Sequence, residues 1–390
     1  MTPDVLEAQR DGNASHRTTG VWDDSAVDPV TPVATVSSWP TELTVPGHRS
    51  VTGWAISAVS VAPTHRRQGV ARALLEAELR TARSLNVPVA ILTVSEATIY
   101  GRYGFAPAAR AAEISVDTSR TKWAGPVASG RVQFVTAEQL EPDGRRLLEE
   151  VRLTIPGHIE FPEYRWKRLL GLHVTEDDAS KDVRFVRYDD AVGQPQGFAV
   201  YRITETERGE NQQVLTVLHL VAATDDAYAG LWRYLTEMDL VCEVKAPLRS
   251  VDEALAWQLS NGRALRKTTE QDHLWIRILE NERALEARRY FAPGRIVLEV
   301  DDALGFAAGR TLLEIAADGS ASATAFDGAI PDDAAAIALG VNELAALYLG
   351  GVSATTLARA GRITELTDGA AVAVDGAFRS DPAPWLSIWF

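Results

Sequence analysis

The sequence predicts an α+β protein with two successive mixed sheets flanked by helices and a smaller α/β region at the C-terminus. Three observations support this prediction. A strand, a turn, a long amphipathic helix and a second strand follow one another within residues 55–107. The same alternation of strands and helices returns within residues 125–280. From residue 281 onward the pattern changes, with alternating strands first and helices after them.

Residues 55–107 give the clearest local signals. Ala55–Val61 is typical of a strand in which Val59 and Val61 share one face, and Pro63 ends it because proline cannot donate to a ladder. After a turn, apolar residues recur at helical spacing: Val70, Ala71, Leu74, Leu75, Leu79, Ala82 and Leu85. Such a helix presents unpaired N–H groups and the positive end of its dipole at its start.

The turn before this helix has the form R-x-x-G-x-A, from Arg66 and Arg67 through Gln68, Gly69 and Val70 to Ala71. Gly69 lets the backbone approach a ligand closely, and the two guanidinium groups suit phosphate. We therefore predict a diphosphate site, although an arginine pair in a turn, taken alone, is more often a solvated surface. The glycines and lysine of the GxGxxG and Walker motifs are missing.

A second motif follows the next strand. Residues 61–70 (VAPTHRRQGV) and 95–105 (SEATIYGRYGF) together resemble the GCN5-related N-acetyltransferases (GNAT), and among these the enhanced intracellular survival (Eis) family of actinobacteria. The resemblance implies an N-acetyltransferase that uses acetyl-CoA as co-substrate. It implies that the stretch from Arg66 to Ala71 holds the diphosphate and that the amides of Val59 and Val61 pair with the pantetheine arm. Ser95 and Glu96 would complete the coenzyme site.

The resemblance also implies two catalytic groups. Tyr100 matches the general acid that protonates the leaving thiolate, whereas by itself it would more often be a packing residue. A phenol with a pKa of about 10 is a reasonable donor to a thiolate whose conjugate acid has a pKa of about 8–9. The chain ends with Trp385-Leu386-Ser387-Ile388-Trp389-Phe390, and because loose termini are normally polar we expect Trp389 and Phe390 to be buried. In the family the C-terminal carboxylate serves as catalytic base. A free α-carboxylate, with a pKa of about 3.5, is a weak base, so it could orient the ammonium as much as deprotonate it.

Residues 1–124 are predicted to form the acetyl-CoA-binding GNAT domain, and residues 125–280 a second, degenerate GNAT-like domain. The second copy is expected to have strands at 196–203, 214–222, 241–244 and 273–279 and helices at 227–238 and 252–259. Its equivalent turn carries Asp225 and Asp226, which would repel a pyrophosphate. We therefore expect no CoA at the second copy.

By resemblance, residues 281–390 form a sterol-carrier-protein-like domain that supplies the C-terminal carboxylate, with strands at 295–301, 310–316 and 320–326 and helices at 342–349, 353–359 and 370–378. Lipid binding does not follow from such a fold. GNAT domains of this class open with a further strand and one or two helices, and almost none of that is present. This predicts a start codon assigned too late, or else the loss of part of the acceptor wall.

The composition of the chain argues against several classes of function. The net charge of −14 argues against nucleic-acid binding, and the single cysteine, Cys242, with seven scattered histidines predicts no disulfide and no metal site. No signal peptide or long apolar run is present, which predicts a cytoplasmic protein without membrane attachment. Residues 1–124 carry 12 basic and 12 acidic residues, whereas residues 125–280 carry 19 and 26, and residues 281–390 carry 8 and 15. The acidic regions favour a cationic amine as substrate and equally fit simple solubility.

The predicted function is acetyl transfer from acetyl-CoA to a primary amine of a cationic small molecule, such as an aminoglycoside or a polyamine. Two alternatives remain open: a non-catalytic acyl-CoA-binding sensor or scaffold, and a protein lysine acetyltransferase. Family resemblance alone implies a homo-oligomer, a hexamer.

Overall fold

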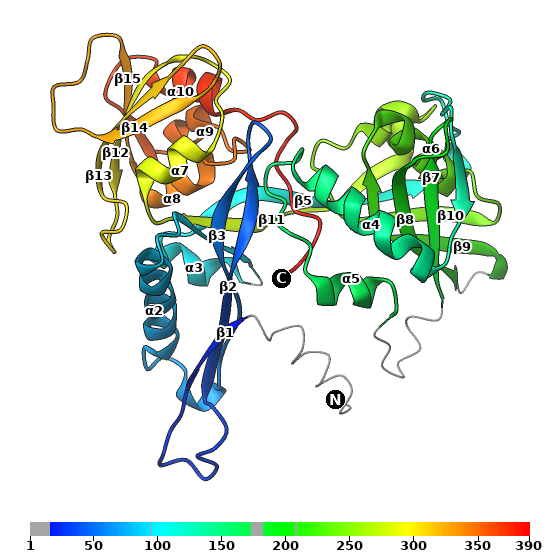
Figure 1. Cartoon of the computed structure of the whole chain (residues 1–390), viewed down its shortest axis with the longest axis horizontal. Coiled ribbons are helices and arrows are strands. Elements are labelled where there is room, and N and C mark those ends of the chain that lie inside the picture. The colour runs from blue at the N-terminus through cyan, green and yellow to red at the C-terminus, as the bar shows by residue number, and fades with distance from the viewer. Residues whose placement is uncertain (1–15, 95, 173–181, 207–208) are drawn as a thin grey trace. The chain divides into compact units, whose positions relative to one another are not determined.

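The computed structural model describes residues 16–94, 96–172, 182–206 and 209–390, and Figure 1 shows their arrangement into strands and helices. The opening segment of the chain and Ser95 lie outside the described residues. Two compact units result. The described parts of the larger unit are residues 16–110, 154–159 and 272–390, and those of the smaller unit fall within residues 111–153 and 160–271.

The larger unit contains sheet strands that neighbour one another in the order β1-β2-β3-β4-β11, although the first half of β11 is counted with the smaller unit. Its strands are β1 (Arg17–Val21), β2 (Ala34–Val45), β3 (Arg49–Val61), β4 (Val89–Thr93) and β11 (Leu265–Ile278). β3 and β4 pair in parallel and the other neighbours antiparallel. The strand predicted at 55–61 is confirmed as the second half of β3.

Helix α2 (Val70–Ser84) packs its apolar side against this sheet. Leu74, Leu75, Leu79 and Ala82 are at most 4% exposed, as the helical spacing predicts. The assignment of Leu85 to this buried face is wrong: the helix ends at Ser84, and Leu85 is 57% exposed. The parallel β3–α2–β4 connection places the start of α2 at the carboxyl end of β3.

After β4 the chain forms helix α3 (Ala97–Tyr100), a 3₁₀ turn (Gly101–Tyr103) and strand β5 (Ala106–Asp117), through which it passes into the smaller unit. That unit has the strand order β5-β10-β9-β8-β7-β6. Its other elements are β6 (Arg131–Phe134), α4 (Ala137–Arg152), α5 (Glu163–Leu169), β7 (Val183–Asp189), β8 (Pro195–Thr206), β9 (Gly209–Ala222), α6 (Asp225–Thr236) and β10 (Val241–Arg249).

The predictions for the second copy are largely confirmed in β8, β9, α6, β10 and β11. The helix predicted at 252–259 is wrong, because Ala254–Gln258 forms only a 3₁₀ turn that buries Leu255. Helix α4 was not predicted from the sequence, although a complete capping box at Thr136 and Gln139 marks its start.

The C-terminal part of the larger unit is a five-stranded sheet of order β14-β13-β12-β15-β16 with four helices. Its elements are α7 (Asn281–Ala287), β12 (Gly294–Asp301), β13 (Gly309–Ile315), β14 (Ala321–Ala325), β15 (Ala334–Gly340), α8 (Val341–Leu347), α9 (Ala354–Arg359), β16 (Ile363–Glu365) and α10 (Ala370–Phe378). All three predicted strands and all three predicted helices are confirmed. Strand β15 was missed because its sequence, AAAIALG, favours a helix by local propensity.

Arg277 on β11 joins this C-terminal part to the first sheet. Its side chain is fully buried, and its Nη2 donates to both oxygens of Asp302 at 2.7 Å. Its Nε donates to the carbonyl oxygen of Tyr103, 2.8 Å away, in the turn that follows Tyr100. Asp302 accepts further bonds from the backbone N–H groups of Leu304 and Ala307. The buried charge is therefore paired and hydrogen-bonded, which is what a buried ion pair requires.

Replacing Arg277 with methionine (Arg277→Met) should lower the free energy of unfolding by about 3–5 kcal/mol, because Asp302 would keep its burial and lose its counter-ion. Urea denaturation followed by tryptophan fluorescence measures this. Arg83→Met is the matched control: this guanidinium, 41% exposed, pairs with Glu280 at 2.7 Å, and its loss should change stability by less than about 1 kcal/mol. Equal losses in the two variants would contradict the role of Arg277.

Candidate active site

The turn between β3 and α2 forms an open helix N-terminus. Gly69 is the N-cap of α2, has φ +84°, and no side chain caps it. A Cβ at Gly69 would meet nothing within 4 Å, and residues 66–69 are exposed. The first N–H groups of α2 are therefore accessible, and Arg66 and Arg67 precede them in the same exposed turn. This arrangement suits an anion, and the residues fit a diphosphate.

β3 separates from β4 next to this turn. The two strands pair only through Gly53–Ala55 on β3 and Val89–Ile91 on β4. Beyond this point Ala58 has φ +51° and the register with β2 shifts, which is a β-bulge. The N–H of Ala62 donates to Val33 on the β2 side. Because successive amides of a regular strand point to opposite edges, that of Val61 is expected to point away from β2, as an extended ligand arm beside β3 would require.

Tyr100 ends helix α3, directly after β4. Its side chain is 8% exposed and packs edge-on against Phe105, with ring centroids 6.2 Å apart. Burial raises the pKa of the Tyr100 phenol, and the charges of Glu96 and Tyr103 raise it further. The phenol therefore stays protonated at neutral pH and can donate a proton. Glu96, the N-cap of α3, is exposed and accepts a bond from Thr98.

The C-terminus docks on the last residue of β4. The hydroxyl of Thr93 donates to a carboxylate oxygen of Phe390 at 2.9 Å and accepts a bond from the Phe390 N–H at 3.4 Å. The Phe390 ring lies edge-on to Trp39, 5.9 Å between centroids, and is 7% exposed. Figure 1 traces this last segment, in red, from the C-terminal domain to the first sheet. Burial is confirmed for Phe390 but wrong for Trp389, which is 40% exposed.

The two groups predicted to be catalytic thus lie at the same end of β4, with Phe390 on its last residue and Tyr100 on the helix that follows. Sequence reasoning missed Thr93. The available signal was a hydroxyl side chain at the end of the otherwise apolar strand VAILT, immediately before the second motif. Nothing local links it to Phe390, because the two are 297 residues apart in the chain.

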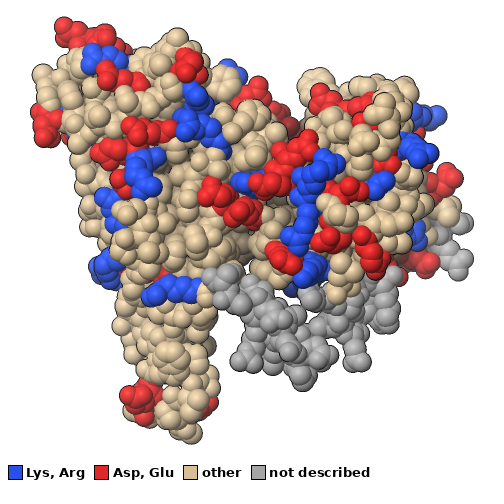
Figure 2. All heavy atoms as spheres, in the orientation of Figure 1, with Lys and Arg blue, Asp and Glu red and all other residues tan. Residues whose placement is uncertain are grey.

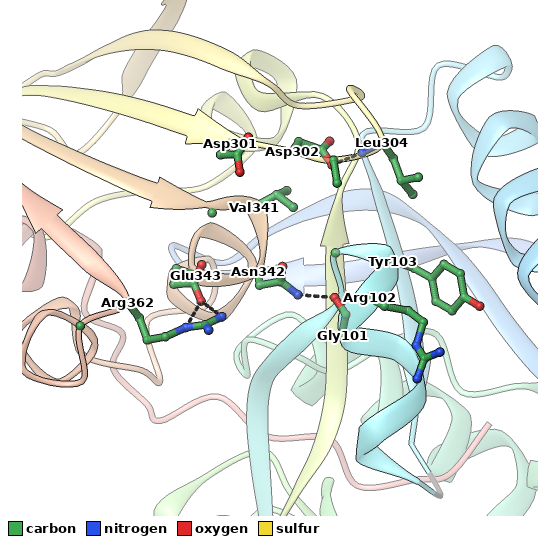
Figure 3. A pocket seen from close by; sticks show the side chains of 14 residues that line it. Gly101, Arg102, Tyr103, Asp301, Asp302, Leu304, Val341, Asn342, Glu343 and Arg362 are labelled. Carbon is green, nitrogen blue, oxygen red and sulfur yellow. Dashed lines mark hydrogen bonds and ion pairs between the residues drawn. The ribbon is translucent and has the colours of Figure 1, made fainter.

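A cavity of about 320 Å³ lies between the turn that follows Tyr100 and the C-terminal sheet (Figure 3). Asn342, at the start of α8, donates from Nδ2 to the carbonyl oxygens of Gly101 and Phe105, both at 2.8 Å. These bonds and that of Arg277 satisfy three backbone carbonyls of the segment from Gly101 to Phe105. Through Asn342, the C-terminal domain therefore fixes the backbone of the turn that follows Tyr100.

The corresponding helix start in the smaller unit is filled by the chain itself. Thr224 caps α6 through a bond from the N–H of Ala227. Asp226 accepts bonds from the N–H of Ser129 and from the hydroxyl of Tyr188. The acidic turn predicted to exclude CoA is thus occupied by internal contacts.

Comparisons with known proteins agree with this architecture. Residues 2–108 and 157–278 each match an acetyltransferase (GNAT) domain, and residues 281–387 match a sterol carrier protein domain. An uncharacterized N-acetyltransferase of Streptomyces avermitilis is 36% identical, over 98% of this chain and 92% of its own length. The N-acetyltransferase Eis of Mycobacterium tuberculosis is 33% identical, over 87% of this chain and 81% of its own length.

Solved structures show the same fold. Eis1 from Mycobacterium abscessus superposes with a TM-score of 0.81 and 28% identity, over 96% of this chain and 91% of that one. A GCN5-related N-acetyltransferase from Anabaena variabilis gives a TM-score of 0.82 at 21% identity, over 100% of this chain and 94% of that one, and supports the fold alone. With two GNAT domains followed by a sterol carrier protein domain, the chain belongs to the Eis family of GNAT N-acetyltransferases.

Proposed function

We propose that this acetyltransferase transfers the acetyl group of acetyl-CoA to a primary amine of a cationic small molecule, of the aminoglycoside or polyamine type. The observation that carries the proposal is the C-terminal carboxylate held by Thr93 at the end of β4. A fixed negative charge at this place attracts an ammonium group. Cytoplasmic location and assembly as a hexamer belong to the same proposal.

Surface charge adds little to the choice of substrate. On the face drawn in Figure 2, acidic and basic side chains are interspersed. The net charge of −14 supplies a general attraction for cations, which is screened over about 8–10 Å at physiological salt. Selection of the amine therefore rests on the local carboxylate.

The coenzyme would lie along β3 and the start of α2. The stretch from Arg66 through Gln68, Gly69 and Val70 to Ala71 would bind the diphosphate, with Arg67 next to the open helix N-terminus. The N–H groups of Val59 and Val61 would pair with the pantetheine arm, which needs an unpaired strand edge of the kind that β3 offers beyond Ala55. Ser95 and Glu96 would complete the site.

The reaction divides between two groups, the Phe390 carboxylate and the Tyr100 phenol. The Phe390 carboxylate orients the acceptor ammonium and accepts its proton, and the freed amine forms a C–N bond with the thioester carbon. The nitrogen then loses a second proton to solvent, the C–S bond breaks, and Tyr100 gives its phenolic proton to the departing sulfur and regains a proton from solvent. The raised pKa of Tyr100 keeps that proton in place until the thiolate forms. The products are an amide and a free thiol.

A thiol-release assay tests the substrate class. With acetyl-CoA present, kanamycin or a diamine should release CoA thiol at least about tenfold faster than buffer alone. A lysine-containing peptide that is acetylated faster than either amine would instead make the chain a protein lysine acetyltransferase. Coenzyme binding by calorimetry without turnover on any amine would make it a sensor.

The glycine at the helix start offers a second test. Gly69→Ala should weaken CoA binding by about tenfold or more, since a methyl group would enter the space where the phosphates approach the backbone. Gly193→Ala is the matched control, because Gly193 has the same φ of +84° and equally open surroundings. The two variants should lose similar stability, as seen in their melting temperatures. Calorimetry showing equal CoA affinity in both would contradict the diphosphate site.

The catalytic roles predict a specific loss of turnover. Tyr100→Phe and deletion of Phe390 should each lower kcat by about 10²–10⁴-fold and leave acetyl-CoA binding unchanged. Tyr103→Phe removes a hydroxyl from a ring that is equally buried, at 5% exposure, and should change kcat little. Because the pKa of Tyr100 is raised, any alkaline fall in kcat caused by its deprotonation should lie above pH 10. Unchanged turnover in either variant rejects that residue's role.

A further inference from the structure

The last residues of the chain are held by isolated contacts. Residues 383–390 contain neither helix nor strand. The Trp385 N–H donates to the carbonyl of Pro156 at 3.1 Å, and Phe390 contacts Thr93. Between these two anchors the carbonyl of Ile388 receives a bond from His273 Nε2 at 2.7 Å. Each such contact fixes a short piece of the segment that carries the terminal carboxylate.

His273 makes this hydrogen bond to Ile388 from a fully buried position. The side chain is 0% exposed, and its ring lies edge-on to Trp389, 4.4 Å between centroids. Since Ile388 offers a carbonyl oxygen, Nε2 must carry the proton, and Nδ1 is then an acceptor. Within the described residues Nδ1 has no hydrogen-bond partner. A buried polar ring is unfavourable unless it is bonded, so its bond to the tail is the evident compensation.

His273 stands on the strand that also fixes the turn after Tyr100. Arg277, four residues further along β11, donates to the carbonyl of Tyr103. Four residues of a strand span about 13 Å, and a paired strand does not stretch. β11 is paired with β4 from Leu274 to Ile278. One rigid strand thus carries the anchor of the tail and the anchor of the tyrosine turn.

We propose that His273 is a positioning residue, which holds the Ile388 carbonyl and thereby sets where the Phe390 carboxylate stands relative to Tyr100. The inference rests on the proposed role of Phe390. Two residues separate the anchored carbonyl from the carboxylate, a reach of at most about 7 Å. A shift of the tail at Ile388 is therefore passed on to the carboxylate, and a misplacement of about 1 Å can lower a rate about 10²-fold.

Two variants of His273 test its hydrogen bond to the Ile388 carbonyl separately from the packing of its ring. His273→Leu fills the site with an apolar side chain and removes the donor, whereas His273→Gln keeps an amide N–H near the position of Nε2. His273→Leu should lower kcat by about 10–100-fold with the KM for acetyl-CoA unchanged, and His273→Gln should restore kcat to within about threefold of the natural protein. Equal kcat in the Leu variant and the natural protein would overturn the inference, and so would an equal loss in both variants.

A double variant separates this inference from the role of Phe390. If His273 acts through the carboxylate, His273→Leu should have almost no effect on kcat once Phe390 is deleted, because the two losses are then not additive. Fully additive losses would overturn the inference and leave the role of Phe390 standing. Unchanged kcat after deletion of Phe390 alone would reject Phe390 as the base. It would also overturn this inference, because the role of His273 rests on that base.

A measurement that does not depend on catalysis keeps the inference testable if His273→Leu folds poorly. Carboxypeptidase A should release Phe390 at least about tenfold faster from His273→Leu or His273→Asn than from the natural protein, because a loosened tail is accessible more often. The side chain of asparagine is too short to reach Ile388 from the same backbone. The variants must bind acetyl-CoA with the natural affinity to show that they are folded. Release at the natural rate from folded His273→Asn would overturn the inference.

Discussion

The buried guanidinium of Arg277 is the constraint on which the geometry of the site depends. An isolated charge in the interior is unfavourable by several kcal/mol, so Arg277 requires Asp302 from the C-terminal domain and the Tyr103 carbonyl from the first domain at the same time. It also explains Gly104. A Cβ at that position would lie 2.5 Å from Nε of Arg277, so the glycine after Tyr103 in the second motif is a packing requirement as well as a turn. The same guanidinium thus makes both the ion pair and the bond to the tyrosine turn.

In the proposed mechanism this arrangement gives the C-terminal domain a structural part. Asn342 supports the backbone next to Tyr100 directly and Asp302 does so through Arg277, and the chain then continues from this domain to Thr93. The proposed acid and the proposed base are therefore both positioned by contacts of one domain. A shift of the C-terminal domain would move both groups.

Much of the fold could be predicted from the sequence, because patterns of two and of 3.6 residues mark most strands and helices. The failures have local causes. The helix periodicity continued to Leu85, although the helix ends at Ser84, and the alanines of β15 favour a helix until its neighbours β12 and β16 pair with it. At the proposed site, the loop from Arg66 to Ala71 and the tyrosine lie in contiguous motifs, which is why a pattern could predict them. Thr93 and His273 could not be predicted in this way, because their partners in the tail lie 297 and 115 residues away and contacts at that range leave no periodic signal.

In the proposed mechanism the base is a main-chain carboxylate, and Thr93 donates to one of its oxygens. No acidic side chain at this position would supply the negative charge. Any residue appended after Phe390, such as a purification tag, would turn this carboxylate into an uncharged amide. The proposed base therefore depends on a free α-carboxylate at Phe390 rather than on the identity of a side chain.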